Sequence, residues 1–486
     1  MRILICLLLS VSLASCEDNV VVKNEDITKK KSASLKIPNG DSDTVTIRQL
    51  MNEKGLKSLS VAVFENYEVI WTGTWGVKYD SIPIDVNTAY STASISKPIT
   101  ALLCAILENR GLLSLSVPVN TYLKRWQLPK NKFNEEIEVT LELLLSHTSG
   151  ATQGGFTDFY QGDTIPSILQ SVHGKVPHNE AVKLVFKPGT DWRYSGGGYT
   201  IAMMVLEDYF GKSLADLANE YIFAPLKLEH TTMKQPNQKG FLKNVAKAHD
   251  EAGNLIRTGI PITPQVSASG MWSSPTDLAT LLIEIQKALN RKGSSIISEE
   301  VAKRTTEIVT LKGMRGWSLG WERMNWYGNI DWFSHGGANT GIGGHVYATM
   351  SGGNGIVMLG NGPNKVRMPI TDVLRDNIIR THQWGTELDW VNQERLPETL
   401  ISEILGHYKD IKFGPILEIK ESDGKLFFPV AWGGIRHNLI YVGDSTFIMN
   451  EVSGKFRFNF VNGPTEIEFL RDDVETLSFT MFEKVR

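Results

Sequence analysis

The sequence predicts an α+β protein that carries a separate β-rich unit at its C-terminal end. Residues 58–64 and 67–75 alternate or run apolar on either side of Glu65-Asn66, a pattern typical of a β-hairpin. An almost wholly apolar stretch over residues 98–109 predicts a buried helix. From residue 403 onward the chain consists of short strand-like runs separated by turns, which indicates a small antiparallel sheet or barrel.

The overall composition predicts a protein without a nucleic-acid partner. The chain has 486 residues, of which 50 are Lys or Arg and 53 are Asp or Glu. This near-neutral balance gives no sign of a basic stripe for nucleic acid or of a polybasic membrane patch. The length predicts two or three domains, each able to bury a substantial core.

The first residues have the pattern of an export signal. Arg2 supplies a positive charge, residues 3–13 form a short apolar run, and Leu13-Ala14-Ser15-Cys16 resembles the lipobox of bacterial lipoproteins. We therefore expect a signal peptide over residues 1–15, lipidation of Cys16, and a lipid-anchored protein of the bacterial cell envelope, facing the periplasm or the cell surface. An ordinary secretory cleavage site is the alternative. The polar, Lys-rich residues 16–43 then form a tether between the membrane and the body.

Cysteine usage predicts neither a disulfide nor a metal cluster. Cys6 leaves with the signal peptide and Cys16 carries the lipid, so that Cys104 alone remains. Cys104 lies inside the apolar helix, where a single cysteine usually serves packing.

The main body, which holds the site described below, is expected over residues 44–384 and the C-terminal barrel-like domain over residues 398–486, with a linker near residues 386–397. Gly111 ends the apolar helix, and a mixed, mostly helical region extends to about residue 264. Ser274-Pro275 is a start signal for a further helix. Additional helices are predicted at 166–173, 199–210 and 368–380, and β-like runs between 318 and 359. The C-terminal strands are predicted at 416–420, 426–429, 438–441, 447–451, 455–460, 465–470 and 476–482.

Ser94-Ile95-Ser96-Lys97 has the pattern of an activated serine. A serine three residues before a lysine lies on the same face of a first helical turn. A serine hydroxyl is a weak nucleophile and needs an adjacent base, and a lysine becomes that base when burial lowers its pKa. The positive end of the helix would also favour an oxyanion beside Ser94. A second copy, Ser422-Asp423-Gly424-Lys425, lies on an Asp-Gly turn typical of a hairpin, so this spacing alone does not identify a catalytic site.

Three further clusters carry polar groups among glycines. Tyr194 precedes Gly196 in Tyr194-Ser195-Gly196, where a phenol near a lysine would relay a proton. His335-Gly336-Gly337-Ala338 has the pattern of an edge strand whose glycines let a substrate backbone lie close. For both clusters a structural role is the alternative. His147 could be read as a base, but we interpret it as holding its loop through hydrogen bonds to the backbone.

Together and in this order, these segments resemble the serine β-lactamase-like hydrolases, the family of class C β-lactamases, penicillin-binding proteins and related esterases. The resemblance extends over about residues 44–382. It rests on six segments: Ser94-Ile95-Ser96-Lys97-Pro98, Gly111-Leu112-Leu113-Ser114-Leu115, Leu144-Leu145-Ser146-His147-Thr148-Ser149-Gly150, Tyr194-Ser195-Gly196, Ser269-Gly270-Met271-Trp272-Ser273 and His335-Gly336-Gly337.

The resemblance implies a β-lactamase/transpeptidase-like antiparallel sheet flanked by helices, with an all-helical subdomain over the site. Ser94 matches the acylated nucleophile, Lys97 the residue that helps deprotonate it, and Tyr194 the proton shuttle of a Tyr-x-Asn motif. His335-Gly336-Gly337 matches the Lys-Thr-Gly or His-x-Gly strand, and the N–H groups of Ser94 and Ala338 would form the oxyanion hole. No metal or organic cofactor belongs to this mechanism.

Two departures from the family pattern affect the expected substrate. Gly196 stands where members that act on amides commonly have Asn, and the loss of that contact removes about 0.5–1.5 kcal/mol for a substrate amide. His335 replaces a lysine whose permanent charge faces a carboxylate in β-lactamases. We therefore expect a small-molecule substrate that is either a carboxylic ester or a peptide containing D-amino acids. A true β-lactamase is a weaker alternative, and a catalytically inactive binding lipoprotein that uses the same cleft is the alternative of a different class.

Overall fold

A computed structural model describes most of the chain, including the whole region in which the predicted site lies. Cys16, the signal peptide, the linker at 386–395 and most of the tether lie outside the described residues. The described residues are 37–39, 43–177, 179–293, 296–312, 315–326, 330–384, 396–410, 416–422, 424–429, 436–449, 452–460, 465–471 and 477–485.

A mixed set of helices and antiparallel sheets confirms the α+β fold class. Among the described residues, the main sheet has nine strands in the order β10-β11-β12-β13-β14-β15-β3-β4-β5, and the predicted hairpin is the β3–β4 pair. The strands of this sheet are β3 (Ser58–Glu65), β4 (Glu68–Tyr79), β5 (Ile82–Pro83), β10 (Thr310–Lys312), β11 (Arg315–Trp317), β12 (Glu322–Trp326), β13 (Ile330–Asn339), β14 (Ile342–Thr349) and β15 (Gly355–Gly360).

The sheet is buried on both faces, because alternate side chains of its central strands enter two different cores. Ala62 and Phe64 of β3 pack into the large core, whereas Leu59, Val61 and Val63 pack into the smaller one. Two helices, α2 (Ile47–Lys54) and α11 (Asn364–Thr381), cover the smaller core, and α9 (Pro275–Leu289) lies against β3 and β15 on the other face. Ser274 caps α9 with Pro275 in its first turn, as the start signal predicts.

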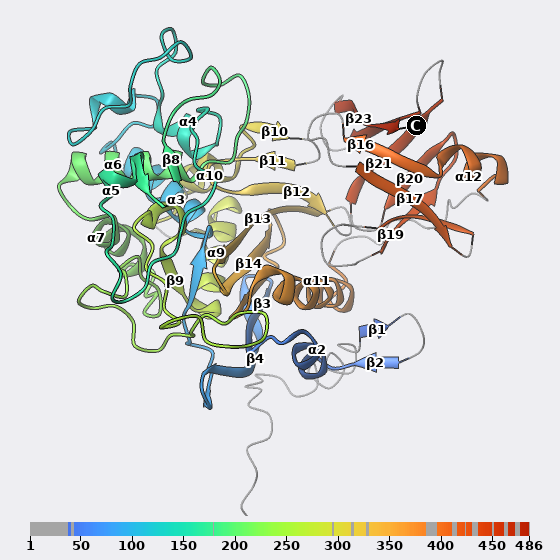
Figure 1. Ribbon diagram of the computed structural model, residues 1–486, viewed down its shortest axis with the longest axis horizontal. Helices are drawn as coiled ribbons and strands as arrows, with labels where there is room; N and C mark the ends of the chain where they lie inside the picture. Colours follow the sequence, from blue (N-terminus) through green and yellow to red (C-terminus); the bar gives the residue numbers. More distant parts are fainter. Residues whose placement is uncertain are drawn as a thin grey trace, which may run out of the picture.

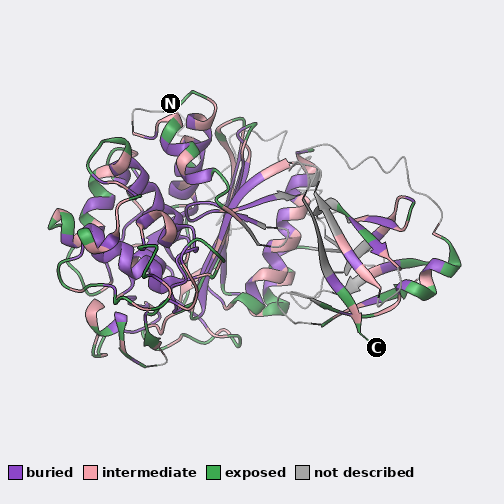
Figure 2. Cartoon of the chain, turned by 90° about the horizontal axis from the view of Figure 1, so that it is seen from above, coloured by how far each residue is buried: buried purple, intermediate pink, exposed green. Residues whose placement is uncertain are grey.

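The helix-rich region lies on one side of the sheet, with α11 on the other side (Figure 1). Its central helix is α3 (Ser96–Asn109), of which the residues from Ser96 to Leu107 are buried. Figure 2 shows that buried residues are frequent throughout the helix-rich region. The other elements around it are α4 (Leu141–Leu145), α5 (Ile168–Val172), α6 (Gly196–Phe210), α7 (Leu214–Ala218), α8 (Val266–Ser269), α10 (Glu299–Thr306), η1 (Val119–Thr121) and η2 (Asn219–Phe223). In the part of the chain that the structure describes, three two-stranded sheets accompany them: β1–β2 (Ile37–Asn39, Asp43–Val45), β6–β9 (Tyr90–Ala93, Met271–Ser273) and β7–β8 (His173–Val176, Asn179–Ala181).

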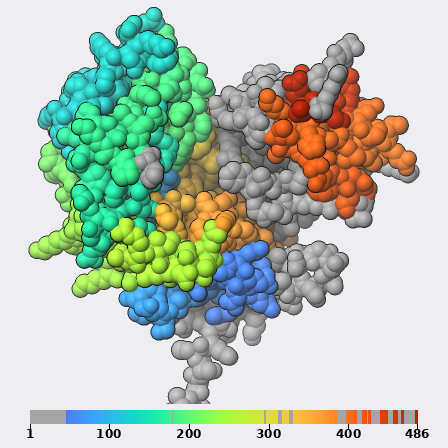
Figure 3. Space-filling view, in the orientation of Figure 1, coloured from blue at the N-terminus to red at the C-terminus, as the bar shows by residue number. Residues whose placement is uncertain are grey.

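The C-terminal segment forms a closed antiparallel barrel, which lies on the opposite side of the molecule from the helix-rich region (Figure 3). Helix α12 (Glu398–Ile404) contributes Leu400 and Ile404 to the barrel core. The barrel strands are β16 (Gly406–Asp410), β17 (Ile416–Ser422), β18 (Lys425–Pro429), β19 (Arg436–Tyr441), β20 (Thr446–Met449), β21 (Val452–Asn459), β22 (Glu466–Arg471) and β23 (Leu477–Val485). Seven of these correspond to predicted strands, and β16 was not predicted.

Two further sequence predictions can be checked in the described residues. Ser422 and Lys425 pair across the β17–β18 hairpin, which agrees with the interpretation of that Ser-x-x-Lys copy as a turn. Cys104 is fully buried in α3. Within the described residues, we find no helix with both the length and the apolar character needed to cross a membrane.

Candidate active site

Ser94 lies at the sharp turn between β6 and α3. The residue before it, Ala93, has φ of +47°, a left-handed conformation that is uncommon for a residue with a side chain. Ser96 holds this turn, because its hydroxyl donates to Ala93 O at 2.6 Å and accepts from Met271 N–H at 2.9 Å. The turn is therefore fixed to β9, and Ser94 stands partly exposed at its tip.

Lys97 lies one helical turn further on and is only 1% exposed. Its Nζ lies 3.0 Å from Ser94 Oγ and donates to Ala268 O at 2.8 Å. Burial lowers the pKa of Lys97 from 10.5 to about 7, because it removes water from around the charged ammonium group. An amine that is about half neutral at pH 7 is able to accept the Ser94 proton.

Tyr194 is held against this pair by the loop that contains His147. Arg193 N–H donates to His147 O at 2.9 Å, and Ser195 N–H donates to His147 Nδ1 at 3.1 Å. The two residues that flank Tyr194 are thus both bound to one histidine, whose ring centroid lies 4.5 Å from that of Tyr194. These contacts agree with our interpretation of His147 as a residue that holds its loop.

The surroundings of Tyr194 move its pKa in the opposite direction from that of Lys97. Burial raises the pKa of the Tyr194 hydroxyl above its ordinary value, while a hydrogen bond with Ser94 opposes the increase. Lys97 Nζ lies 4.7 Å from the Tyr194 ring centroid. One group is therefore poised as a base and the other stays protonated, the contrast expected of an acid–base pair.

The edge of β13 closes the site on its other side. β12 pairs with β13 as far as Ser334, so that residues 335–339 have no strand partner on this edge within the described part of the chain. Gly337 faces the Ser94 turn: a Cβ atom there would lie 2.0 Å from Thr92 O and 3.0 Å from Ser94 N. Only a glycine permits this approach, and it brings the backbone around Ala338 next to the nucleophile.

The other predicted residues of β13 differ in their surroundings. His335 is buried, with Nδ1 2.6 Å from Gly336 O, and burial together with the Lys97 charge lowers its pKa to about 3. Its imidazole is therefore neutral at physiological pH and supplies no positive charge. Gly336 faces His345 on the neighbouring strand instead of Ser94.

Arg367 was not predicted from the sequence. It extends from α11 and donates hydrogen bonds to the backbone of β13 and of the segment after β15. It is fully buried in α11 and donates to Gly337 O at 3.1 Å and to Gly362 O at 2.7 Å. These bonds attach β13 to α11 at the glycine that approaches Ser94.

Gly196 is the first residue of α6, and the ring of Phe156 occupies the space that a side chain at position 196 would need. A Cβ atom at Gly196 would lie 2.5 Å from the Phe156 ring. The phenyl group therefore occupies the space of the Asn side chain that the family resemblance implies at this position. Phe156 also lines the cavity that opens at Ser94.

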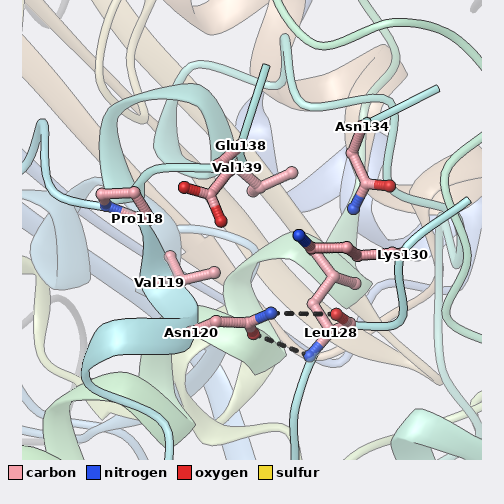
Figure 4. A pocket seen from close by; sticks show the side chains of 8 residues that line it. All are labelled: Pro118, Val119, Asn120, Leu128, Lys130, Asn134, Glu138 and Val139. Atoms are coloured by element: carbon pink, nitrogen blue, oxygen red, sulfur yellow. Dashed lines mark hydrogen bonds between the residues drawn. The ribbon is translucent and has the colours of Figure 1, made fainter. Parts of the chain in front are cut away.

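That cavity has a volume of about 230 Å³, which suits a small substrate. Its lining consists of Ser94, Lys97, Gly154, Gly155, Phe156, Asp158, Ser269, Ala338, Asn339 and Thr340. Asp158 was not predicted from the sequence, where its local signal is the loop that follows Gly154-Gly155. A second cavity lies between Val119, Leu128 and Glu138 (Figure 4), but its volume of about 10 Å³ admits no more than one water molecule.

Comparison with known proteins identifies the family of this chain. The family model described as Beta-lactamase matches residues 45–378, which is more than half of the chain. The chain belongs to the beta-lactamase family. The segments that carried the resemblance all fall within the matched residues.

Relatives in this family have different names. A protein named beta-lactamase from Pseudomonas fluorescens is 26% identical over 57% of this chain and 72% of its own length. A teichoic acid D-alanine hydrolase from Staphylococcus aureus is 27% identical over 47% of this chain and 54% of its own length. The chain spans between 40% and 72% of the length of the first curated relatives it matches.

The structural similarity to solved proteins covers nearly the whole of this chain. An octameric penicillin-binding protein homologue from Pyrococcus abyssi superposes with a TM-score of 0.58 at 18% identity, covering 94% of this chain and 98% of the other. This similarity supports the fold of the family, with its sheet flanked by helices.

Proposed function

We propose that this protein is a serine hydrolase that forms an acyl-enzyme on Ser94 and cleaves a carboxylic ester or an amide of a D-amino-acid peptide. The observation that carries the proposal is the contact of 3.0 Å between Lys97 Nζ and Ser94 Oγ, with Lys97 buried and its pKa lowered to about 7. A lysine kept only for structure would gain nothing from being stripped of water beside a serine hydroxyl.

The first half of the reaction uses these groups in order. Neutral Lys97 accepts the proton of Ser94 as Oγ attacks the carbonyl carbon, and the carbonyl oxygen becomes an oxyanion. We assign its stabilisation to the N–H groups of Ser94 and Ala338, in keeping with the close approach of Gly337 to Ser94 N. Tyr194, which stays protonated, donates to the leaving oxygen or nitrogen and recovers a proton from the Lys97 ammonium.

The second half releases the acyl group. Water attacks the ester carbonyl of the acyl-enzyme and gives its proton to the Lys97–Tyr194 pair. The Ser94 oxygen leaves with a proton, so that the free serine, the neutral lysine and the carboxylic acid product remain. No step requires an oxidant, a reductant or a further reactant.

The charge and the shape of the cleft favour some substrate classes over others. A neutral His335 offers no cation for the carboxylate of a penicillin, and Phe156 fills the space of an amide-binding side chain. Esters and peptides containing D-amino acids therefore rank above β-lactams. The relative named teichoic acid D-alanine hydrolase supports a substrate that contains a D-amino acid.

The test is the intact mass of the purified protein after exposure to a fluorophosphonate, with Ser94→Ala as the matched control. We expect one adduct on the wild type and none on Ser94→Ala. If the folded wild type forms no adduct, the serine is not activated and the binding-protein alternative takes its place.

We further propose that Cys16 carries a lipid that anchors the protein to a membrane of the bacterial cell envelope. This rests on the lipobox-like Leu13-Ala14-Ser15-Cys16. Expression in a bacterium with a clickable fatty acid should label the wild type and leave Cys16→Ser unlabelled. Equal labelling of the two proteins would refute the anchor.

A further inference from the structure

Asp158 is a titratable group of the cleft that the proposed mechanism does not use. It lines the same cavity as Ser94 and Lys97, and its carboxylate accepts a hydrogen bond of 2.7 Å from Thr340 N–H. The hydroxyl groups of Thr340 and Thr263 also bond to it. The carboxylate is therefore fixed in position relative to the end of β13, whose edge faces Ser94.

Asp158 is the only acidic side chain among the described residues that line this cavity, and Lys97 is the only basic one. Lys97 bonds to the neutral groups of Ser94 and Ala268 instead of to Asp158. Burial raises the pKa of the Asp158 carboxyl, and a cation entering the cavity would lower it again. The cleft thus holds a carboxylate whose hydrogen-bond partners are all neutral, in a cavity large enough to admit a cation.

We propose that Asp158 is an anionic subsite for the free ammonium group of the substrate, and that the substrates are esters or amides of α-amino acids with an unblocked amine. This inference rests on the proposed function of Ser94. It narrows that function to one chemical class, because an N-acylated amino acid has no cation to offer.

We place the amine in the acyl part of the substrate, because Asp158 lines the same cavity as Ser94 and Phe156. Phe156, two residues earlier in the same loop, lies against Gly196, and the resemblance places the contact with the acyl group of amide substrates at that position. An α-ammonium group lies one carbon from the carbonyl that Ser94 attacks. A cavity of about 230 Å³ accommodates a single aminoacyl residue of modest size between the two.

The experiment compares two substrates that differ only at the amine. D-Alanine methyl ester and N-acetyl-D-alanine methyl ester are offered to the wild type, together with the corresponding p-nitroanilides and the L-isomers. We expect kcat/KM to be at least about tenfold higher for the free amine, the effect of one charge-assisted hydrogen bond. In Asp158→Asn, which keeps an oxygen acceptor for Thr340 N–H, that ratio should fall to about one.

The matched control is Asp163→Asn. Asp163 lies in the same segment, but its carboxylate pairs with Arg257 and does not line the cavity, so the wild-type ratio should persist. Fluorophosphonate labelling of each sample reports independently whether an activated serine has formed. If Asp158→Asn does not fold, wild-type discrimination between alanine methyl ester and methyl lactate, which has a hydroxyl in place of the amine, decides the question.

The possible failures are distinguishable. An adduct on Ser94 with a wild-type ratio near or below one overturns the subsite but leaves the serine hydrolase intact. A ratio above ten that Asp158→Asn does not change assigns the amine to another group and also overturns it. Absence of both adduct and turnover refutes the proposed function itself.

Discussion

The pH dependence of Ser94 acylation tests the central claim, that Lys97 is the base. Lys97 is 1% exposed and its pKa is lowered to about 7. At pH 7 about half of the enzyme then holds a neutral lysine, whereas an ordinary lysine would be neutral in about 0.03% of molecules. Burial therefore increases the population of competent base by a factor on the order of 10³.

This shift sets the shape of the expected profile. The rate of fluorophosphonate labelling should rise with pH and reach a plateau above about pH 7, and at pH 5 it should be about 100-fold below that plateau. Because Tyr194 has a raised pKa, no loss is expected on the alkaline side below about pH 9. Lys97→Ala should lower the plateau about 10²–10⁴-fold and remove the inflection. Labelling at a series of pH values, followed by intact mass, measures both.

The two buried histidines of the site do not produce the same profile. The pKa of His335 is about 3, and burial and the Lys97 charge hold the pKa of His147 well below its ordinary value. An inflection near pH 7 is therefore diagnostic of the lysine. A flat wild-type profile between pH 5 and 8, or an inflection that survives in Lys97→Ala, would refute the reasoning.

Three further predictions concern the residues that build the site, the first of them with a matched control. Gly337→Ala should lower the melting temperature and slow labelling, because the new methyl group would lie 2.0 Å from a backbone carbonyl; Gly154→Ala, where nothing lies within 4 Å, should leave the melting temperature unchanged. His147→Ala removes the acceptor of Ser195 N–H, and should cost about 1–3 kcal/mol in denaturant unfolding as well as slowing labelling; unchanged stability would contradict that role. Lys97→Met should be more stable than the wild type at pH 6. Because the wild-type lysine binds its proton less tightly when folded, that gain should shrink by about 1.4 kcal/mol per pH unit between about 7 and 10.5, and a constant difference across this range would exclude a lowered pKa.

The sequence predicted those parts of the site that depend on local geometry. Ser94 and Lys97 are three residues apart, and Lys97 N–H bonds to Ser94 O across the turn that leads into α3, so their contact follows from geometry local to the sequence. The meeting of Tyr194 and the edge of β13 with this pair depends on tertiary packing, and it was expected only through the resemblance to a family. Helix and strand predictions succeeded where apolar periodicity was long, as in α3, α9 and the β3–β4 hairpin.

Features without a local pattern were missed for physical reasons. Ala268 contributes a backbone carbonyl, which every residue has, so no side chain marks it. Arg367 and Asp158 are single charged residues without a motif around them. Their roles become visible only because the fold places Arg367 beside Gly337 and Asp158 in the Ser94 cavity. Strand β16 is short and mostly polar, and it is stabilised by pairing with β23, in which His407 faces Val485. The formation of this strand, and the barrel closure that it completes, depend on contacts between residues far apart in the sequence, so a local pattern does not predict them.

The separation of two opposite charges within one small cleft explains how the site performs both of its proposed tasks. If Asp158 paired directly with Lys97, the ion pair would raise the pKa of the lysine and leave it protonated at pH 7, unable to accept the Ser94 proton. Instead each group is held by neutral partners, Lys97 by Ala268 O and Asp158 by Thr340 N–H. Burial makes the lysine about half neutral at pH 7, while Asp158 is the acidic group of the cavity. A lysine with a lowered pKa and a carboxylate that does not pair with it are the conditions for activating a serine and for attracting an amine in the same pocket.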